Sequence, residues 1–342
     1  MPEQNLLLEI KNLKTHYFLH EGVVRAVDGV TFDIARNRTV GVVGESGCGK
    51  SVTARSILQV LDRGGRIMDG EIVLHRKQSG GADGQSEDLI DLVRLNPRGN
   101  EIRAIRGAEI AMIFQEPMTS FSPVHTIGNQ IMEAITLHQP VTKQEAQAEA
   151  IEILHSVGIP KAEQHLDSYP HQLSGGMRQR AMIAMALSCR PSLLIADEPT
   201  TAIDVTTQAQ ILDLMRELQQ EYGMAIMLIT HDLGVIAEMA DDVVVMYLGK
   251  VVERAPVDDI FHAPQHPYSQ SLLRSIPKLG PKTHEKLLTI RGSVPSPYHH
   301  PAGCPFHPRC PAFVRDRCNV TEPKLVAVGE RRWVNCLLYD GG

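Results

Sequence analysis

The chain has 342 residues and a formal net charge of -6, with 43% hydrophobic and 22% charged residues. These proportions are ordinary for a soluble globular protein. No apolar stretch approaches the roughly 18 residues that a membrane-spanning helix needs. The N-terminus lacks the basic and apolar regions of a signal peptide, so we expect a cytoplasmic protein.

Four apolar runs predict buried strands, and helical patterns flank each of them. In chain order the runs are Thr39–Val43, Ile110–Phe114, Leu193–Ala196 and Ala225–Ile229. Strands that alternate with helices indicate an α/β fold with a mainly parallel sheet. Further along, Val243–Tyr247 and Lys250–Glu253 predict a strand pair that turns at Leu248 and Gly249.

Two segments between these strands have a different character. The polar stretch between Arg76 and Asn100 predicts a mobile surface loop. Residues from about 117 to 185 carry helical patterns without strand signals, which predicts a helical subdomain inserted into the α/β core. Within it, Thr142 and Glu145 have capping-box spacing ahead of a helix that runs to Val157.

The alternation of helices and strands ends near residue 260, where proline becomes frequent. We therefore expect an α/β domain at 1–260 and a small, loop-rich C-terminal module at 261–342. The second segment carries 11 Lys and Arg against 5 Asp and Glu, which favours a separate module. It shows no interleaved aromatic residues, so its positive charge is weak evidence for a nucleic-acid role.

A glycine-rich motif follows the first predicted strand. Residues 44–51, Gly-Glu-Ser-Gly-Cys-Gly-Lys-Ser, match the pattern of a phosphate-binding loop between a strand and a helix. Such a loop points backbone N–H groups at phosphate oxygens. We expect Lys50 to reach the β- and γ-phosphates of ATP and the Ser51 hydroxyl to hold Mg²⁺. The residues expected at the nucleotide are Gly44, Glu45, Ser46, Gly47, Cys48, Gly49, Lys50, Ser51 and Val52.

Cys48 lies inside this loop, close in sequence to the charge of Lys50. A thiol beside positive charge and a helix N-terminus has a lowered pKa and reacts readily. This position therefore predicts a reactive thiol that bound MgATP shields. The alternative is a buried and inert thiol.

Two carboxylates follow the apolar strand Leu193–Ala196. Asp197 is placed to hold Mg²⁺, and Glu198 can act as the general base that polarises the attacking water. Acidic residues at strand ends are common surface features. In company with the phosphate loop they indicate nucleotide hydrolysis.

The segment Leu173-Ser174-Gly175-Gly176-Met-Arg-Gln resembles the signature loop of the ABC ATPase family. The order of the elements is also that of the family: phosphate loop, Gln115, signature, Asp197-Glu198, Asp204 and His231. The resemblance implies an ATPase whose nucleotide-binding domain, at 1–260, has a P-loop ABC core and an inserted helical subdomain.

The resemblance also assigns roles within one subunit. Tyr17 resembles the aromatic residue that stacks on adenine, with its neighbour Phe18 as the alternative. Gln115 resembles the residue that touches Mg²⁺ and the attacking water. His231 resembles the residue that contacts the γ-phosphate.

Other residues resemble those that act across a dimer of such subunits. Ser174, Gly175 and Gly176 resemble the loop that clamps the γ-phosphate of ATP on the opposite subunit. Asp204 resembles a residue of the loop that crosses the dimer interface. The resemblance therefore implies that a second ABC ATPase subunit completes each site. ATP would join the two subunits, and hydrolysis would release them.

A closer resemblance, to the ATPases of dipeptide and oligopeptide permeases, covers nearly the whole chain. The resemblance rests on the sequence segments Tyr169–Ser174, Ala196–Thr201, His266–Tyr268 and Gly292–Pro297. It implies a dimer with a second ATPase subunit, as a heterodimer with a homodimer as the alternative, at the cytoplasmic face of the inner or cell membrane. Two transmembrane permease subunits and an extracytoplasmic solute-binding protein are the other implied partners. Related systems carry nickel, glutathione, sugars or antimicrobial peptides, and an ATPase that does not touch its cargo leaves this choice open.

Four of the six cysteines, Cys304, Cys310, Cys318 and Cys336, crowd the end of the chain. Structural zinc usually takes close pairs of cysteines, whereas this wider spacing fits an iron–sulfur cluster better. The resemblance to permease ATPases favours a 4Fe–4S cluster. Zinc and reduced structural cysteines are the alternatives, and His307 is near enough in sequence to replace one ligand.

Two rival functions fit the sequence less well. ABC ATPases that act on nucleic acid generally carry two cassettes or coiled-coil arms, which are absent from this sequence. A subunit that binds ATP without hydrolysing it is disfavoured because Glu198 and His231 are intact.

Overall fold

The computed structural model describes residues 5–77, 87–115, 121–201, 203–275 and 290–340. Its contacts divide the chain into two compact units. The first contains residues 1–34, 39–93 and 230–342, and the second contains residues 35–38 and 94–229. The start of the predicted helical subdomain, at 117, lies outside the described residues.

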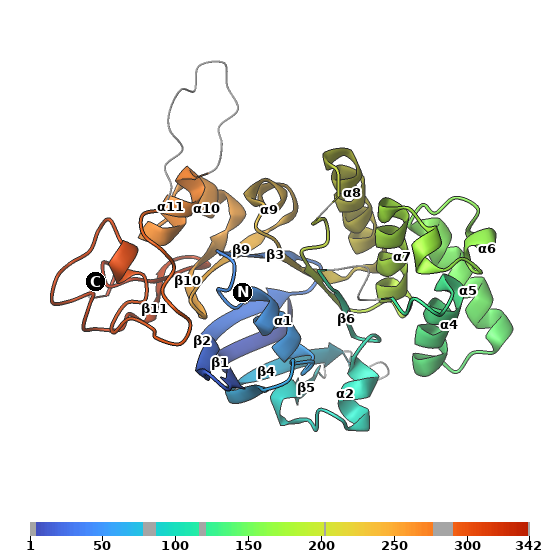
Figure 1. Ribbon diagram of the computed structural model, residues 1–342, viewed down its shortest axis with the longest axis horizontal. Helices are drawn as coiled ribbons and strands as arrows, with labels where there is room; N and C mark the ends of the chain where they lie inside the picture. Colours follow the sequence, from blue (N-terminus) through green and yellow to red (C-terminus); the bar gives the residue numbers. More distant parts are fainter. Residues whose placement is uncertain (1–4, 78–86, 116–120, 202, 276–289, 341–342) are drawn as a thin grey trace, which may run out of the picture. The chain divides into compact units, whose positions relative to one another are not determined.

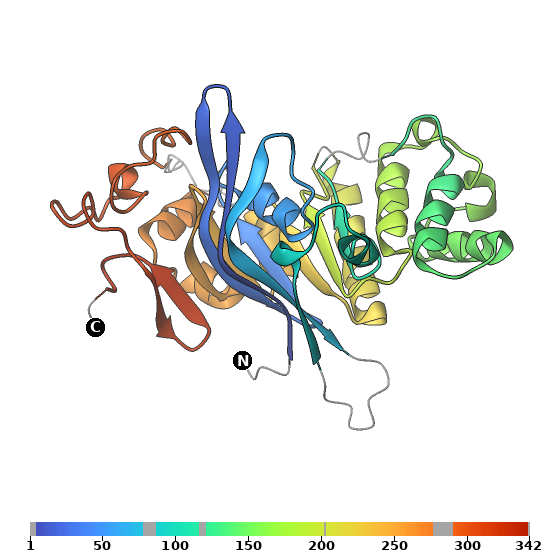
Figure 2. The same cartoon turned by 90° about the horizontal axis from the view of Figure 1, so that it is seen from below.

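An antiparallel sheet of four strands forms part of the first unit. Its spatial order is β2-β1-β4-β5, and its strands are β1 (Leu6–Leu19), β2 (Gly22–Ala35), β4 (Gly65–Lys77) and β5 (Glu87–Asp91). Figure 2 shows β1 and β2 as a long hairpin. Leu8 and Ile10 of β1 pair with Leu74 and Ile72 of β4, and all four side chains are buried.

The predicted surface loop between Arg76 and Asn100 is only partly a loop. It contains β5 and the 3₁₀ turn η2 (Leu92–Arg94), and α2 (Asn100–Ile105) begins at its end. The sequence concealed β5 because a short polar strand depends on backbone pairing with β4, where Leu74 lies opposite Ile90. Residues 78–86 lie outside the described residues.

Five further strands of the first unit lie in the order β11-β12-β10-β9-β3. Val42 of β3 (Thr39–Val43) pairs in parallel with Val244 of β9 (Asp242–Tyr247), and every residue of both strands is buried. The predicted pair is confirmed, since β9 turns through Leu248 and Gly249 into antiparallel β10 (Lys250–Pro256). The helices of this unit are α1 (Lys50–Ile57), α9 (Leu233–Met239), α10 (Val257–His262), α11 (Pro267–Arg274) and the 3₁₀ turn η4 (His307–Arg309).

The C-terminal segment is joined to this sheet. β11 (Leu325–Gly329) and β12 (Arg332–Asn335) form a hairpin, and β12 pairs with β10 so that Trp333 lies opposite Arg254. The Arg254 guanidinium lies 4.8 Å from the centre of the Trp333 ring and forms an ion pair with Asp33. A self-contained, loop-rich cysteine module is therefore not supported. Its proline-rich sequence concealed a hairpin whose two strands have only five and four residues.

The second unit contains three parallel strands in the order β8-β7-β6. These strands, β6 (Ile110–Ile113), β7 (Leu193–Asp197) and β8 (Ala225–Ile229), confirm the runs predicted from the sequence. Every residue of β7 and β8 is buried, which explains why unbroken apolar runs signalled them. Ile110 pairs with Leu193, and Leu193 pairs with Ala225.

Helices fill the rest of the second unit. Four of them pack on one another and form the green group of Figure 1: α4 (Ile127–His138), α5 (Lys143–Ser156), α6 (Ala162–His165) and α7 (Gly175–Leu187). The 3₁₀ turn η3 (Pro170–Gln172) precedes α7, and α8 (Val205–Tyr222) follows β7. The predicted capping box is confirmed: the Glu145 N–H donates to Thr142 Oγ1 at 3.3 Å, and Glu145 Oε2 accepts from the Thr142 N–H at 2.7 Å. Across the described ranges, no helix combines the length and apolarity needed to cross a bilayer.

Candidate nucleotide-binding site

The phosphate loop takes the conformation that its glycines permit. It leaves β3 at Val43 and enters α1 at Lys50. Gly44 has a φ of 151° and Gly49 a φ of 102°, values that favour glycine. A Cβ at Gly44 would lie 2.2 Å from the Met246 carbonyl oxygen, and one at Gly49 would lie 2.2 Å from that of Ala26. The close approach of two backbone segments therefore requires both glycines.

Lys50 lies across its own loop. Its Nζ donates to the carbonyl oxygens of Gly44 at 2.8 Å and Glu45 at 3.2 Å, and its side chain is buried. Ser51 and Val52 follow in the first turn of α1 and are half-buried, whereas Ser46 and Gly47 are exposed. The ammonium is thus held beside the backbone N–H groups that the motif offers to phosphate.

The prediction of a reactive thiol at Cys48 is wrong. Only 3% of this residue is exposed, and burial raises the pKa of its thiol more than the Lys50 charge lowers it. The sequence showed the neighbouring charge but not the packing. The thiol lies beneath the loop, where it would be 2.7 Å from a Cβ at Gly44.

Tyr17 and His231 also belong to the first unit. Tyr17 is half-buried on β1, where it pairs with Gly65, and its neighbour Phe18 is 42% exposed, with the Arg66 guanidinium 5.4 Å from its ring centre. Phe18 therefore presents a more accessible ring than Tyr17. His231 is exposed and follows β8; the next residue, Asp232, caps α9 by accepting from the Gly234 N–H at 2.8 Å.

In the second unit, the ends of β6 and β7 bring Gln115 and Glu198 together. Glu198 Oε2 accepts from Gln115 Nε2 at 2.9 Å and from Thr201 Oγ1 at 2.9 Å. Glu198 has a φ of 50°, a left-handed value that is uncommon outside glycine and often found at functional sites. Asp197, the last residue of β7, is 1% exposed. The arrangement fixes the orientation of the Glu198 carboxylate.

The signature residues form the N-terminus of α7. Ser174 caps the helix by accepting from the Met177 N–H at 3.3 Å, and Gly175 and Gly176 are its first two residues. Ser174 and Gly175 are exposed. A helix N-terminus without bulky side chains presents N–H groups and a partial positive charge that suit an anion.

Asp204 has a comparable role at the start of α8. Its carboxylate accepts from the Thr207 N–H at 3.0 Å and from the Thr207 hydroxyl at 2.8 Å, and these hydrogen bonds lower its pKa. Asp204 is exposed. It is therefore held as a carboxylate on the surface of the second unit.

Family models match both ends of the chain. The model described as ABC transporter matches residues 27–201, and the model described as oligopeptide/dipeptide transporter, C-terminal region, matches residues 252–318. The chain belongs to the ABC transporter family. It is an ATPase cassette of mixed α/β structure.

Curated relatives resemble the ABC ATPase over almost their full length. The oligopeptide transport ATP-binding protein AppD of Bacillus subtilis is 51% identical over 335 residues, which are 98% of this chain and 97% of AppD. The dipeptide transport ATP-binding protein DppD of Escherichia coli is 48% identical over 330 residues, 96% of each chain. Among solved structures, the dimeric post-hydrolysis state of the ATP-binding cassette MJ0796 bound to ADP and Pi has a TM-score of 0.62 at 25% identity. That match covers 73% of this chain and 98% of the MJ0796 chain.

The four C-terminal cysteines of the ABC ATPase gather without forming a metal site. The Cys304 N–H donates to the Cys318 carbonyl at 2.8 Å, and burial, with a smaller effect of the neighbouring thiols, raises the pKa of Cys304 and Cys310 to about 11. All four are free thiols, and Cys336 is buried. The described residues contain no group of three or more His, Cys, Asp or Glu side chains arranged to hold a metal ion. The expected 4Fe–4S cluster is therefore not supported by this arrangement.

Sequence reasoning gave no role to Thr201 or Arg309, although both contact expected site residues. Thr201 donates a hydrogen bond to Glu198. It lies in the segment Ala196–Thr201, which resembles peptide-permease ATPases, but the sequence gave it no role of its own. Arg309 forms a two-pronged ion pair with Glu45 of the phosphate loop. Because 264 positions separate the two, no local pattern signalled that contact.

Proposed function

We propose that this ABC ATPase binds and hydrolyses ATP to power the import of dipeptides and oligopeptides. The observation that carries the proposal is the double match of the chain, to the ABC cassette and to the C-terminal region of oligopeptide/dipeptide transporters. Relatives whose names specify oligopeptide and dipeptide transport add support, since they align over 96% or more of this chain.

In the proposed site, Lys50 and the backbone N–H groups of residues 44–52 bind the phosphates. Ser51, Gln115 and Asp197 would hold Mg²⁺, and their hydroxyl, amide and carboxylate oxygens are the ligands that this ion prefers. When bound, Mg²⁺ neutralises charge that develops on the phosphates. Tyr17, with Phe18 as the alternative, stacks on adenine.

Glu198 is the proposed general base. Because Gln115 Nε2 and Thr201 Oγ1 both donate to Oε2, the Glu198 carboxylate has a fixed direction, and in the proposed role it accepts a proton from the attacking water. Gln115 donates through its amide nitrogen, which leaves its amide oxygen for Mg²⁺ or the attacking water. His231 contacts the γ-phosphate and keeps the reacting groups aligned.

The proposed working unit is a heterodimer with a second ABC ATPase subunit. Ser174, Gly175 and Gly176 would bind the γ-phosphate on that subunit through the N-terminus of α7, and Asp204 would lie at the interface. The cassette MJ0796, whose fold is similar, is dimeric, which supports a dimer of cassettes. Two transmembrane permease subunits and an extracytoplasmic solute-binding protein would complete the importer, with this chain at the cytoplasmic face of the membrane.

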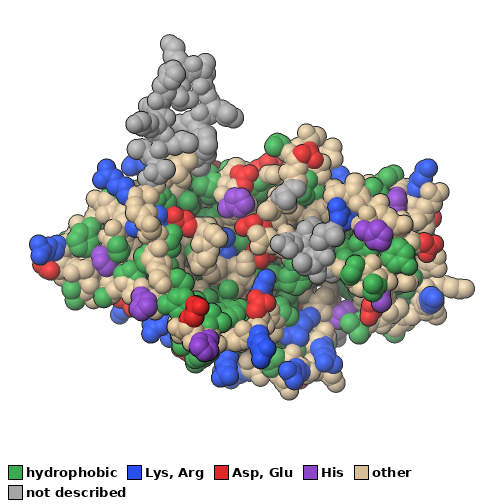
Figure 3. Space-filling model, viewed as in Figure 1, with side chains coloured by type: hydrophobic (Ala, Val, Ile, Leu, Met, Phe, Trp, Pro, Cys, Tyr) green, Lys and Arg blue, Asp and Glu red, His purple; other side chains and the backbone are tan. Residues whose placement is uncertain are grey.

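A transport function is preferred to a nucleic-acid function on the family matches, not on surface charge. On the face drawn in Figure 3, several Lys and Arg side chains gather along the lower edge, and Asp and Glu side chains lie elsewhere on the same face. A patch of Lys and Arg is typical of a nucleic-acid surface, but both family models and the named relatives concern transport.

The cargo is tested in the complete transporter. The chain, its partner ATPase and the permeases are reconstituted with the solute-binding protein, and ATP turnover is measured with dipeptides, longer peptides, nickel, glutathione or a sugar. We expect stimulation by peptides. Stimulation by nickel, glutathione or a sugar alone contradicts the peptide cargo but leaves ATP hydrolysis intact. Absence of ATP turnover in every condition contradicts the proposed function as a whole.

We also propose that Cys304, Cys310, Cys318 and Cys336 hold a 4Fe–4S cluster that stabilises the C-terminal segment. The gathering of four buried or half-buried thiols favours it, and the absence of a preformed metal geometry among the described residues stands against it. Protein purified without oxygen should contain about four irons per chain, the number set by the cluster type. Cys304→Ser should remove the iron, whereas Cys189→Ser, at a half-buried thiol elsewhere, should not. Zinc in place of iron, or no metal, overturns the cluster.

A further inference from the structure

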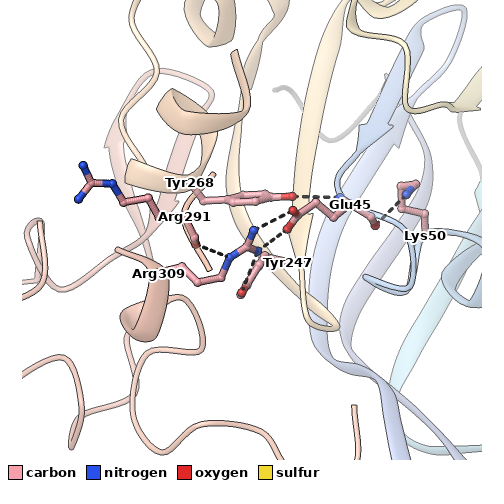
Figure 4. Close-up of polar contacts among 6 residues, drawn as sticks. All are labelled: Glu45, Lys50, Tyr247, Tyr268, Arg291 and Arg309. Carbon is pink, nitrogen blue, oxygen red and sulfur yellow. Dashed lines mark hydrogen bonds and ion pairs between the residues drawn. The ribbon is translucent and has the colours of Figure 1, made fainter. Parts of the chain in front are cut away.

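The phosphate loop is tied to the C-terminal segment through one residue, Glu45. Arg309 Nη1 donates to Glu45 Oε2 at 2.6 Å, and Nη2 donates to Glu45 Oε1 at 3.0 Å (Figure 4). The Glu45 N–H donates to the Tyr268 hydroxyl at 3.0 Å. The Glu45 carbonyl accepts from Lys50 Nζ at 3.2 Å. The carboxylate, N–H and carbonyl of one loop residue are thus all engaged.

Arg309 is itself held on several sides. Its side chain is 4% exposed, its Nε donates to the Arg291 carbonyl at 3.1 Å, and its Nη1 also donates to the Tyr247 hydroxyl at 3.4 Å. The guanidinium lies 5.8 Å from the centre of the Tyr247 ring. Its hydrogen bonds to Glu45 raise the pKa of Arg309, so the guanidinium stays charged at any physiological pH.

An aromatic cluster of Tyr247, Tyr268 and Phe306 supports these contacts. Its ring centres lie 4.8 to 5.3 Å apart, and all three side chains are fully buried. Phe306 and Arg309 come from the same short segment, 304–310, which begins and ends with a cysteine. Tyr268 lies in α11. The C-terminal segment therefore places buried aromatic rings and the Arg309 guanidinium next to the phosphate loop.

We propose that Arg309 is a positioning residue for ATP binding, which holds Glu45 and with it the phosphate loop in the shape that receives the phosphates. This inference rests on the proposed function of the loop. When Lys50 turns toward phosphate, it releases the carbonyls of Gly44 and Glu45. Arg309 and Tyr268 then keep Glu45 in place, together with the Cys48 N–H, which donates to the Glu45 carbonyl at 3.2 Å. A two-pronged Arg–carboxylate pair fixes direction as well as distance.

The pair also controls charge next to the nucleotide. Glu45 is negative and close in the chain to N–H groups that bind negative phosphates. Arg309 neutralises this carboxylate without pointing into the loop itself. Only 25% of the Glu45 side chain is exposed. Loss of the guanidinium would therefore leave a largely buried carboxylate without its partner, and its negative charge would repel ATP.

The test uses the full-length chain in the assembled transporter, with kcat and KM for MgATP measured for each variant. For Arg309→Gln we expect KM to rise about tenfold while kcat changes less than about threefold, since loop shape and charge act on ATP binding more than on the chemical step. Arg309→Lys keeps the positive charge but cannot donate two parallel hydrogen bonds to the carboxylate, so its KM should lie between those of wild type and Arg309→Gln. Arg291→Gln is the matched control: its carbonyl contacts Arg309, but its side chain is exposed and points away in Figure 4, so KM should not change.

Glu45→Gln distinguishes this role from mere support of the fold. If the unpaired carboxylate is what weakens binding, Glu45→Gln combined with Arg309→Gln should recover part of the lost affinity. A double variant that is worse than Arg309→Gln overturns the electrostatic part of the proposal. If Arg309→Gln does not fold, the test rests on Arg309→Lys. A wild-type KM in that variant overturns the proposal that two parallel hydrogen bonds to Glu45 are needed.

Lys50→Ala separates failure of this proposal from failure of the proposed function. Unchanged KM in Arg309→Gln, with ATP binding abolished by Lys50→Ala, overturns the positioning role alone. Normal ATP binding by Lys50→Ala overturns the assignment of the phosphate loop itself.

Discussion

The phosphate loop and the segment 304–310 are both short loops, yet different kinds of interaction determine their conformations. In the phosphate loop, Gly44 and Gly49 permit backbone angles and close contacts that another residue would block. The segment 304–310 has its place because Phe306 packs on Tyr247 and Tyr268 while Arg309 pairs with Glu45. A local rule can be read from a motif, whereas a contact between distant residues cannot. The comparison separates what a motif does from what holds it in position.

The largest expected effect concerns a motif residue. Glu198→Gln removes the general base but keeps a side chain of similar size that still accepts from Gln115 and Thr201. Because positioned acid–base groups typically contribute about 10²–10⁴-fold, turnover should fall by that amount without loss of ATP affinity. Steady-state hydrolysis and ATP binding of the assembled complex measure the two effects separately. Turnover near the wild-type rate contradicts the role of Glu198, provided that the partner subunit carries the same substitution.

The glycines of the phosphate loop provide the next test. Gly49→Ala places a Cβ 2.2 Å from the Ala26 carbonyl oxygen, whereas Gly47→Ala meets no atom within 4 Å. Both positions have positive φ, which costs an alanine roughly 1–2 kcal/mol. We therefore expect Gly49→Ala to weaken ATP binding and lower the melting temperature more than Gly47→Ala. Equal melting temperatures for the two variants would show that the close approach at Gly49 does not constrain the loop.

The packing of the C-terminal segment should depend on pH through His266. Burial lowers the pKa of this imidazole from 6.5 to about 3, and its Nδ1 accepts from the Tyr268 N–H at 3.0 Å. Between those two pH values the unfolded chain binds a proton that the folded chain does not, so stability is full above pH 6.5 and falls as the pH drops toward 3. The melting temperature should follow this trend from pH 7 to pH 5.

A variant isolates the His266 contribution. The adjacent Glu253 has a pKa raised by burial, so its own effect on stability has the opposite sign. His266→Asn keeps a side chain that caps a helix N-terminus but does not titrate. The melting temperature of this variant should depend less on pH between 7 and 5. An unchanged pH dependence would exclude His266 as its source.

The smallest expected effects come from two helix caps. Ser174 caps α7 and Thr142 caps α5, each through one side-chain oxygen. Replacement by alanine should lower stability by about 1 kcal/mol in either case. Only Ser174→Ala should also slow ATP turnover, because only α7 carries the signature. If Thr142→Ala slows turnover as much, the loss reflects stability rather than function.

The sequence predicted the features that depend on local patterns. The buried strands β3, β7 and β8 appeared as unbroken apolar runs, and the α5 cap appeared as Thr142 three residues before Glu145. The strands β1, β2, β4 and β5 were missed because their partly exposed residues gave no continuous run. The hairpin of β11 and β12 was concealed by a proline-rich context.

The candidate site divides in the same way. Lys50, Asp197 and Glu198 follow from motifs, and the structure adds the hydrogen bond from Gln115 to Glu198. The burial of Cys48 and the pairing of Arg309 with Glu45 depend on residues far apart in the chain. A single sequence does not show which distant residues contact one another, so these two features could not be predicted.

The central claim, that residues 44–52 form a phosphate loop that binds ATP, is tested most directly by equilibrium binding of MgATP. The full-length chain is compared with Lys50→Ala and Glu198→Gln, each in the assembled complex. We expect Glu198→Gln to bind as tightly as wild type and Lys50→Ala to lose binding. Wild-type affinity in Lys50→Ala would contradict the account.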